Sequence, residues 1–442
     1  MSGTQELKKM ARTALDGALK RGVKGVRAVA YRSRNVSVTY RKGRPDRVEE
    51  SSRRSLTLHL YIDGKYTACE TNDLRREALD SFLDDSVAMA RAMTPDPFRE
   101  MPDPKLYEGR RELDLELYDP AISKVGSEER RRLAGDIESA ALDEAGERAI
   151  SAETSYEDEQ SELYQIHSNG FEGSRRGTQF WMFGELSLRD EGDRRPSGWD
   201  ISGSRRRDGL PDPAEVGRGA AERARLRLGA EQVGTRRTTM IVENRTVGRL
   251  LGKLLAVTSG RAVQQRRSFL ADARGEKVGS ELLTLIDDPF VPGGFGSRLF
   301  DSEGIAAEKM PVFQNGVFRN FYIDTYYGKK LEAEPTTGSR SNVVIPPGEA
   351  DLERLMADAG DGILVRGFIG GNSNPTTGDF SLGVYGTLFE GGKPGGAVAE
   401  MNIAGNHLEL WKRLVAVGSD TWKHGRLRVP SLVFEGVQFS GS

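Results

Sequence analysis

The chain has 442 residues, enough for two or three domains and a sizeable core. Its 64 basic and 66 acidic residues leave a formal net charge of −2, so no long-range field would attract nucleic acid or an anionic membrane. The single cysteine, Cys69, excludes an intrachain disulfide and a multi-cysteine zinc site. No signal region opens the chain and no apolar run approaches the roughly 20 residues of a membrane span. We therefore expect a cytoplasmic protein without nucleic-acid or membrane partners.

The first half of the chain has the pattern of a sheet flanked by helices. Apolar residues recur at helical spacing from Leu7 to Ala18, and longer helices are expected over 74–93, capped by Thr71-Asn72-Asp73, and over 128–145. Strand-like alternation predicts these segments: 26–31, 36–40, 55–62, 66–69, 149–156, 162–168 and 178–188.

The second half begins after a polar stretch. We expect a mobile loop over 189–213, a short helix over 214–228 and a domain boundary near 229–237. A strand over 238–243 and a helix over 246–260 should follow. Short strands come next, with turns predicted at Asn315-Gly316, Gly391-Gly392 and Gly395-Gly396.

Common catalytic motifs are absent from the sequence. There is no Gly-x-Ser-x-Gly elbow and no Walker-type phosphate loop, and the glycine-rich segment 291–296 is expected to be only a loop. No two of the four histidines, His59, His167, His407 and His424, have helical ligand spacing. Each is expected to be an ordinary surface or core residue, although a site assembled from distant histidines stays open.

Small and amide residues are concentrated between 370 and 420. Two interpretations of Thr376, Thr377, Asp379 and Ser381 stay open at this point. In the first, they form a tight turn into a core strand, where Asp379 caps backbone amides. In the second, this strand faces a partner and pairs through an exposed edge with an extended peptide.

Five short segments, in this order along the chain, resemble the TldD/PmbA family of peptidase proteins. They are Phe300-Asp301-Ser302-Glu303-Gly304, Asn315-Gly316-Val317-Phe318, Pro335-Thr336-Thr337-Gly338, Thr377-Gly378-Asp379-Phe380-Ser381 and Ile403-Ala404-Gly405-Asn406. The last two are most similar to the PmbA (TldE) branch. The resemblance implies an α+β fold with an N-terminal sheet-and-helix domain over 1–232, followed by a mainly antiparallel, barrel-like β domain over 233–442.

The family divides at a metal site. Its TldD branch carries His-Glu-x-x-x-His on a helix and a Cys ligand near the C-terminus, whereas the corresponding positions here are Gly252, Lys253 and Val257, and Cys69 lies in the other half. A protonated amine repels a metal ion and cannot bind it. The resemblance therefore implies no catalytic residue, metal or other cofactor in this chain, with zinc held by a partner subunit. The alternative is a shifted alignment that hides a site elsewhere.

The function implied by the resemblance is that of the non-zinc-binding PmbA/TldE-type subunit of a heterodimeric metallopeptidase. With a TldD-type partner, the chain would shape the channel for unfolded or leader peptides, and activity is expected only in that complex. The expected peptide and partner surface comprises Asn372, Thr376, Thr377, Gly378, Asp379, Ser381, Gly405 and Asn406. The alternative is a peptide-binding or regulatory homodimer without peptidase activity. Direct modulation of DNA gyrase, a third idea, gains no support from the nearly neutral charge.

Overall fold

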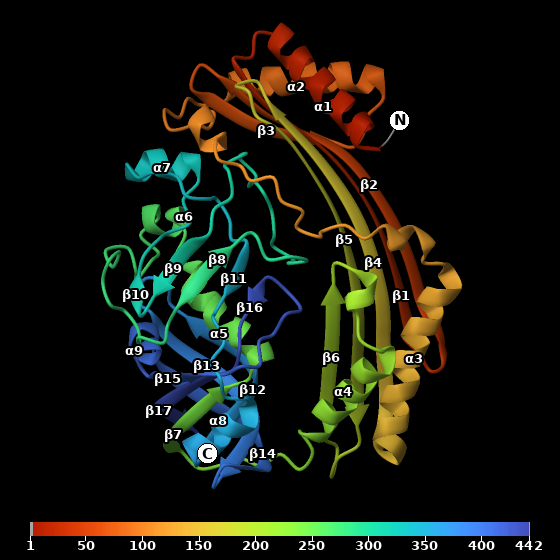
Figure 1. The fold of residues 1–442 in the computed structure, drawn as a ribbon, viewed down its shortest axis with the longest axis vertical. Helices are drawn as coiled ribbons and strands as arrows, with labels where there is room; N and C mark the ends of the chain where they lie inside the picture. The colour runs from red at the N-terminus through yellow and green to blue at the C-terminus, as the bar shows by residue number, and fades with distance from the viewer. Residues whose placement is uncertain (1–2, 442) are drawn as a thin grey trace.

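A curved sheet of six antiparallel strands forms the N-terminal part of the structure, a computed structural model that describes residues 3–441 (Figure 1). The strands are β1 (Gly25–Arg41), β2 (Arg44–Ile62), β3 (Lys65–Thr71), β4 (Ala149–His167), β5 (Glu172–Leu188) and β6 (Ser197–Ser204). Their order is β3-β2-β1-β4-β5-β6. The long strands span about 60 Å and run along one side of the C-terminal part (Figure 1).

Four helices cover one face of this sheet: α1 (Gly3–Lys20), α2 (Arg76–Ala92), α3 (Ser127–Ala145) and α4 (Pro213–Arg225). Side chains of a strand alternate between the two faces of a sheet. The even-numbered positions carry the apolar residues that pack on the helices, among them Val26, Leu58 and Tyr156. Helices α1 and α2 lie at one end of the sheet and α3 and α4 at the other (Figure 1).

The opposite face of the sheet is polar and turns toward the C-terminal part. Its odd-numbered positions include Glu159 and Arg175, which line a cavity together with residues of the C-terminal part. Trp181 stacks on Phe295 of the C-terminal part, with ring centroids 4.7 Å apart. Because buried polar groups are costly without partners, this face must satisfy its charges across the junction.

A small mixed β-barrel forms the core of the C-terminal part. Its sheet has the order β14-β13-β12-β7-β17-β15, and an additional β14–β17 pairing closes it. The strands are β7 (Arg236–Val242), β12 (Gly362–Ser373), β13 (Asp379–Glu390), β14 (Lys393–Asn406), β15 (Leu414–Val417) and β17 (Leu432–Ser440). Only β12 and β7 pair in parallel. Helix α5 (Asn244–Ala256) packs against β12.

A second, five-stranded sheet lies beside the barrel, in the order β10-β9-β8-β11-β16. It comprises β8 (Leu285–Asp288), β9 (Met310–Gln314), β10 (Val317–Phe318), β11 (Asn342–Val344) and β16 (Leu427–Arg428). The short helices are α6 (Gly260–Gln264), α7 (Thr325–Leu331), α8 (Leu352–Ala359) and α9 (His407–Lys412). Single 3-10 turns span Pro104–Tyr107, Pro120–Lys124, Gly146–Arg148 and Arg207–Gly209.

The predicted α+β class with a barrel-like second part is confirmed, whereas several element boundaries are wrong. Segments 26–31 and 36–40 belong to the single strand β1, and 149–156 and 162–168 belong to β4. The polar residues between them stay in the strand because β1 is paired on both sides and an Arg–Glu ion pair of 2.9 Å joins β1 to β4. Among residues 3–441, no helix is both long and apolar enough to cross a lipid bilayer.

Two stretches rich in small residues were wrongly assigned to turns or loops. The expected loop 189–213 contains β6, and Gly395-Gly396 lies inside β14. In β6, a side-chain carbon added at Gly198 would lie 2.1 Å from the backbone of α4, and one at Gly203 would lie 2.3 Å from the Trp181 ring. These glycines allow close packing of a strand, which local sequence does not distinguish from a loop.

The expected cap of the second helix is also wrong. The N-cap position of α2 is Arg75, whose side chain makes no capping bond. Thr71 accepts instead from the amide of Asp73, and Asp73 accepts from the amide of Arg75. The capping side chains therefore fix the loop before the helix.

Candidate functional site

Helix α5 carries two of the three positions, Gly252 and Lys253, that the resemblance sets against the family's metal motif. Its apolar stripe, which includes Leu250, Leu251 and Leu254, is buried in the C-terminal core. Lys253 is exposed on the outward face, and a side-chain carbon built on Gly252 would meet nothing within 4 Å.

The third position of that motif does not share this surface. Val257 follows the helix end, is only 1% exposed and belongs to the same core as the apolar stripe of α5. None of the three positions carries an imidazole, carboxylate or thiolate. Across residues 3–441, no group of three or more His, Cys, Asp or Glu side chains is arranged to hold a metal ion. The donor set therefore does not fit zinc.

The turn between β12 and β13, residues 374–378, contains part of the family signature and is called the signature turn below. Polar side chains hold it, among them Asn406 at the end of β14. Asn406 donates to the carbonyl oxygen of Thr377 at 2.9 Å and to Asp379 Oδ1 at 3.0 Å. Its own Oδ1 accepts from the amide of Leu408 at 3.0 Å and so caps α9. The hydroxyl of Thr377 donates to Asp379 Oδ2 at 2.6 Å, and this bond, followed by the one from Asn406, lowers the pKa of Asp379.

A glycine is required at the centre of this turn. Gly378 has a φ of +85°, and a side-chain carbon there would lie 3.2 Å from Asn406 Nδ2. Thr376 lies beside it, exposed, with its amide bonded to Asn374 Oδ1 at 2.9 Å. The contacts of these residues are those of a tight turn, as the first interpretation predicted. Thr376, Thr377 and Asp379 are nevertheless exposed to solvent.

Small polar residues form the outward face of β12, β13 and β14. Asn372 pairs with Ser381, and Ser381 pairs with Ala404 on the next strand. The Ser381 hydroxyl and the Asn402 amide exchange hydrogen bonds of 3.0 and 3.2 Å. Gly405, opposite Phe380, is exposed as well. The expected surface residues therefore lie together on two adjoining features, the turn and this sheet face.

An exposed strand edge, the second interpretation of this region, is wrong for β13. Asp379–Glu390 has β12 on one side and β14 on the other, and β14 is itself paired with β17 at Asn402 and Ile403. The backbone groups of β13 are already used by its neighbours. A ligand on this surface would meet the outward side chains rather than a free edge.

His407 is buried beside the signature turn. Its Nε2 lies 2.9 Å from Ser373 Oγ, and its ring stacks on Phe269 with centroids 5.8 Å apart. The side chain is fully buried, and burial together with the charge of Lys253 lowers its pKa to about 4. The neutral imidazole therefore packs the end of β12 against Phe269. Nothing in the sequence indicates this role beyond the position of His407 directly after Asn406.

The histidines of the N-terminal sheet also serve packing. His59 contacts Arg27 at 2.8 Å and Tyr66 at 2.8 Å. His167 lies 3.0 Å from the hydroxyl of Tyr107. Burial, followed by the charge of Arg27, lowers the pKa of His59 to about 3 and that of His167 to about 2. The two histidines, distant in sequence, meet near one arginine, which would repel a metal cation.

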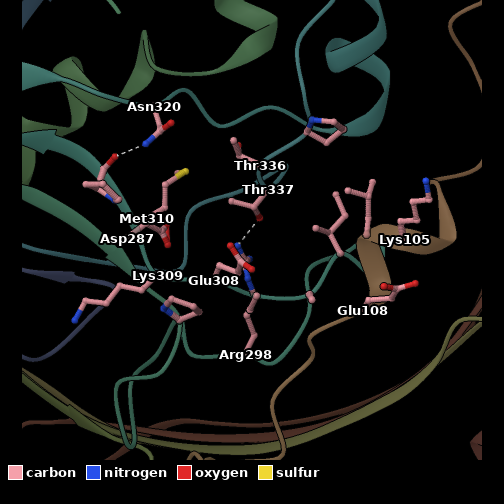
Figure 2. A pocket seen from close by; sticks show the side chains of 17 residues that line it. Lys105, Glu108, Asp287, Arg298, Glu308, Lys309, Met310, Asn320, Thr336 and Thr337 are labelled. Carbon is pink, nitrogen blue, oxygen red and sulfur yellow. Dashed lines mark hydrogen bonds between the residues drawn. The ribbon is translucent and has the colours of Figure 1, made fainter. Parts of the chain in front are cut away.

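The remaining motif residues fix two loops around a cavity of about 430 Å³ (Figure 2). Asp301 accepts from the amide of Glu303 at 2.8 Å and from the amide of Gly338 at 3.1 Å. Arg298 donates to Thr337 Oγ1 at 3.0 Å, at the wall of the cavity (Figure 2). The sequence did not single out Arg298, because an isolated arginine before a loop has no distinctive pattern.

Three domain models of one family match the chain in order. They are described as PmbA/TldA metallopeptidase domain 1 over residues 26–90, the central domain over 120–228 and the C-terminal domain over 235–441. The chain is 26% identical to Metalloprotease PmbA of Escherichia coli O157:H7 over 421 residues, covering 94% of this chain and 92% of the relative. It is 27% identical to a Metalloprotease PmbA homolog of Haemophilus influenzae, covering 99% and 97%.

Solved structures agree in fold over nearly the whole chain. A Bacteroides thetaiotaomicron protein proposed as a modulator of DNA gyrase is 38% identical, with a TM-score of 0.96 and 99% of each chain covered. TldE from Thermococcus kodakarensis has the same fold, with a TM-score of 0.86 at 22% identity over 98% of this chain and 99% of that one. The chain therefore belongs to the PmbA/TldD metallopeptidase family.

Proposed function

We propose that this chain is the PmbA/TldE-type, non-zinc-binding subunit of a heterodimeric cytoplasmic peptidase. The observation that carries the proposal is the outward face of α5, where Gly252 and Lys253 stand in place of a metal ligand and its general base. A TldD-type partner would hold zinc and supply the base. No catalytic step is assigned to this chain.

The contribution of this chain is to shape the peptide channel. The turn at Thr376–Asp379 and the sheet face around Ser381 lie near His407, whose pKa is lowered in part by the charge of Lys253 on α5. Short side chains on this face leave room for an extended backbone, which suits unfolded or leader peptides whose side chains vary. The surface is built from outward side chains, so binding depends on the face of the sheet and not on strand addition.

Reconstitution tests the proposal. Cleavage of an unfolded peptide is measured in three samples: this chain alone, a TldD-type chain alone, and the two chains expressed together. The zinc content and native mass of each sample are measured as well. We expect zinc and cleavage only where the partner is present, and the highest rate in a one-to-one complex. Zinc-dependent cleavage by this chain alone would refute the proposal. A peptide-binding homodimer without cleavage in any mixture would favour the regulatory alternative.

A matched pair of variants tests the surface. Ser381→Tyr adds a large side chain to the proposed face, and Ser51→Tyr adds the same side chain at an exposed position of β2. Tyrosine is well tolerated in strands, so both variants should fold. We expect S381Y to weaken complex formation or cleavage and S51Y to leave both unchanged. Equal behaviour of the two variants would remove the face around Ser381 from the channel.

A further inference from the structure

A cavity of about 220 Å³ between the polar face of the N-terminal sheet and the C-terminal part collects positive charge. Five arginines line it, of which Arg176 is paired with Glu162. The other four come from distant segments: Arg175 of β5, Arg205 just after β6, Arg298 of the loop before Asp301 and Arg426 next to β16. None of these four takes part in the proposed peptidase role.

None of the four arginines forms an ion pair with a carboxylate in the part of the chain that the structure describes. Arg205 donates to the carbonyl oxygens of Thr178 at 3.1 Å and Phe295 at 2.9 Å, and its buried Nε has no partner. Arg175 and Arg426 make no side-chain hydrogen bond within residues 3–441, and both residues are exposed at the cavity. Their guanidinium groups are therefore free to bind a ligand.

The acidic residues at the cavity do not balance this charge. Glu162 is already paired with Arg32 at 2.9 Å and with Arg176 at 3.0 Å. Glu159 accepts from the neutral Gln179 at 3.2 Å and from Tyr31, and burial with the nearby Glu157 raises its pKa, although the charge of Arg205 opposes this rise. The cavity thus keeps an excess of positive charge.

Partial enclosure by the cavity walls, followed by the charges of neighbouring arginines, disfavours the charged forms of Arg175 and Arg205. Burial, then the charges of Arg298 and Arg426, lowers the pKa of Arg175. Burial, then the charges of Arg175 and Arg426, lowers that of Arg205 to about 10. Like charges gathered without a counter-ion are costly in a partly enclosed site, and a bound anion removes that cost.

We propose that this cavity is a binding site for an oxyanion, either a carboxylate or a phosphate. Arg175 and Arg426 provide the free guanidinium forks, whose planar donor geometry matches two oxygens of such a group. Arg205 adds the unpartnered Nε at the wall, and Arg298 adds charge from a fixed position between this cavity and the larger one of Figure 2. The site needs no partner subunit, so it is independent of the proposed peptidase role.

Calorimetric titration of the full chain tests the site. The probes are inorganic phosphate, an unstructured peptide with a free C-terminal carboxylate and the same peptide with an amidated C-terminus. The double variant Arg175→Gln/Arg426→Gln removes two charges that make no internal bond, so its fold should persist. Arg44→Gln, at an exposed position of β2 outside the cavity, is the single-charge control.

We expect the wild type to bind at least one oxyanion probe and the amidated peptide to bind more weakly than the acid. Loss of a charge-assisted hydrogen bond weakens binding by about tenfold or more, so the double variant should lose at least that factor while R44Q keeps the wild-type affinity. Binding of phosphate alone identifies a free oxyanion as the ligand, and binding of the peptide acid identifies a peptide carboxylate. No binding of any probe, or equal affinity in the double variant, would overturn the site.

Discussion

Replacing Asn406 by alanine should loosen the signature turn and shorten α9 at its start. The amide group of this residue makes three bonds, to the Thr377 carbonyl, to Asp379 Oδ1 and from the Leu408 amide. Alanine keeps none of them. A change at this one position therefore tests whether the signature residues act mainly on the structure.

The magnitude follows from two of the bonds. Loss of an asparagine N-cap costs about 1 kcal/mol, and loss of the bond to Thr377 costs about 1 kcal/mol more. The bond to Asp379 is open to solvent and adds little, because water replaces it. We expect the free energy of unfolding to fall by about 2 kcal/mol, which lowers the melting temperature of a chain of this size by about 2 °C if all of it unfolds together.

Urea unfolding and calorimetry measure the change, and hydrogen exchange locates it. The control is Asn402→Ala, because the Asn402 side chain bonds only to the exposed Ser381 hydroxyl. N402A should cost less than about 0.5 kcal/mol, and faster exchange should appear at residues 374–379 in N406A alone. If N406A is as stable as the wild type, or N402A is equally destabilised, the structural account of this turn is wrong.

Four further substitutions test the reasoning elsewhere. Gly378→Ala should lower the free energy of unfolding by about 1–2 kcal/mol, because Gly378 has a positive φ. Gly252→Ala should raise it by about 1 kcal/mol, because Gly252 lies in a helix with open space around it. Urea unfolding measures both changes. His407 stays neutral in the folded chain down to about pH 4, so stability should fall as the pH drops from about 6.5 to 4, and His407→Gln should flatten a pH series of urea midpoints there. Arg130→Ala leaves the buried carboxylate of Asp158 without its bonds of 2.6 and 2.9 Å. The free energy of unfolding, measured in urea, should fall by about 3–5 kcal/mol. The loss should be smaller when Asp158→Asn is made in the same chain, because no buried charge is then left unpaired.

The α+β class was implied by the family resemblance, and apolar periodicity located individual elements because it decides which face of an element is buried. The helix marked by Leu7 to Ala18 is present as expected, and the strands expected over 55–62 and 66–69 lie in β2 and β3, which pair with each other. The errors at β6 and at Gly395-Gly396 have different causes. A polar composition indicated a loop at β6, where Gly198 and Gly203 allow close contact with α4 and Trp181. Glycine favours turns, but Gly395-Gly396 continues β14 at an irregularity in its pairing with β13.

The candidate site was only partly predictable for a different reason. The resemblance identified Asn406 and Asp379 through the motifs that contain them, although the fold brings the two together from 27 residues apart. His407 and Arg298 act through partners that the fold brings from far along the chain, namely Phe269 with Ser373 and the loop at Thr337. A single sequence does not show which residues far apart along the chain come into contact. The same limit hid the meeting of Arg175, Arg205 and Arg426 at one cavity.

The residues that carry the family signature constrain the backbone and do not supply reactive groups. Asp301 fixes two loops through bonds to amides and a hydroxyl, Asn406 fixes a turn and a helix end, and Gly378 allows the conformation between them. None of these contacts requires a metal ion. The fold therefore does not depend on Gly252 and Lys253 on the outward face of α5. The signature predicts the architecture for this reason, whereas under the proposed function the outward face of α5 decides whether that architecture can hold a metal ion.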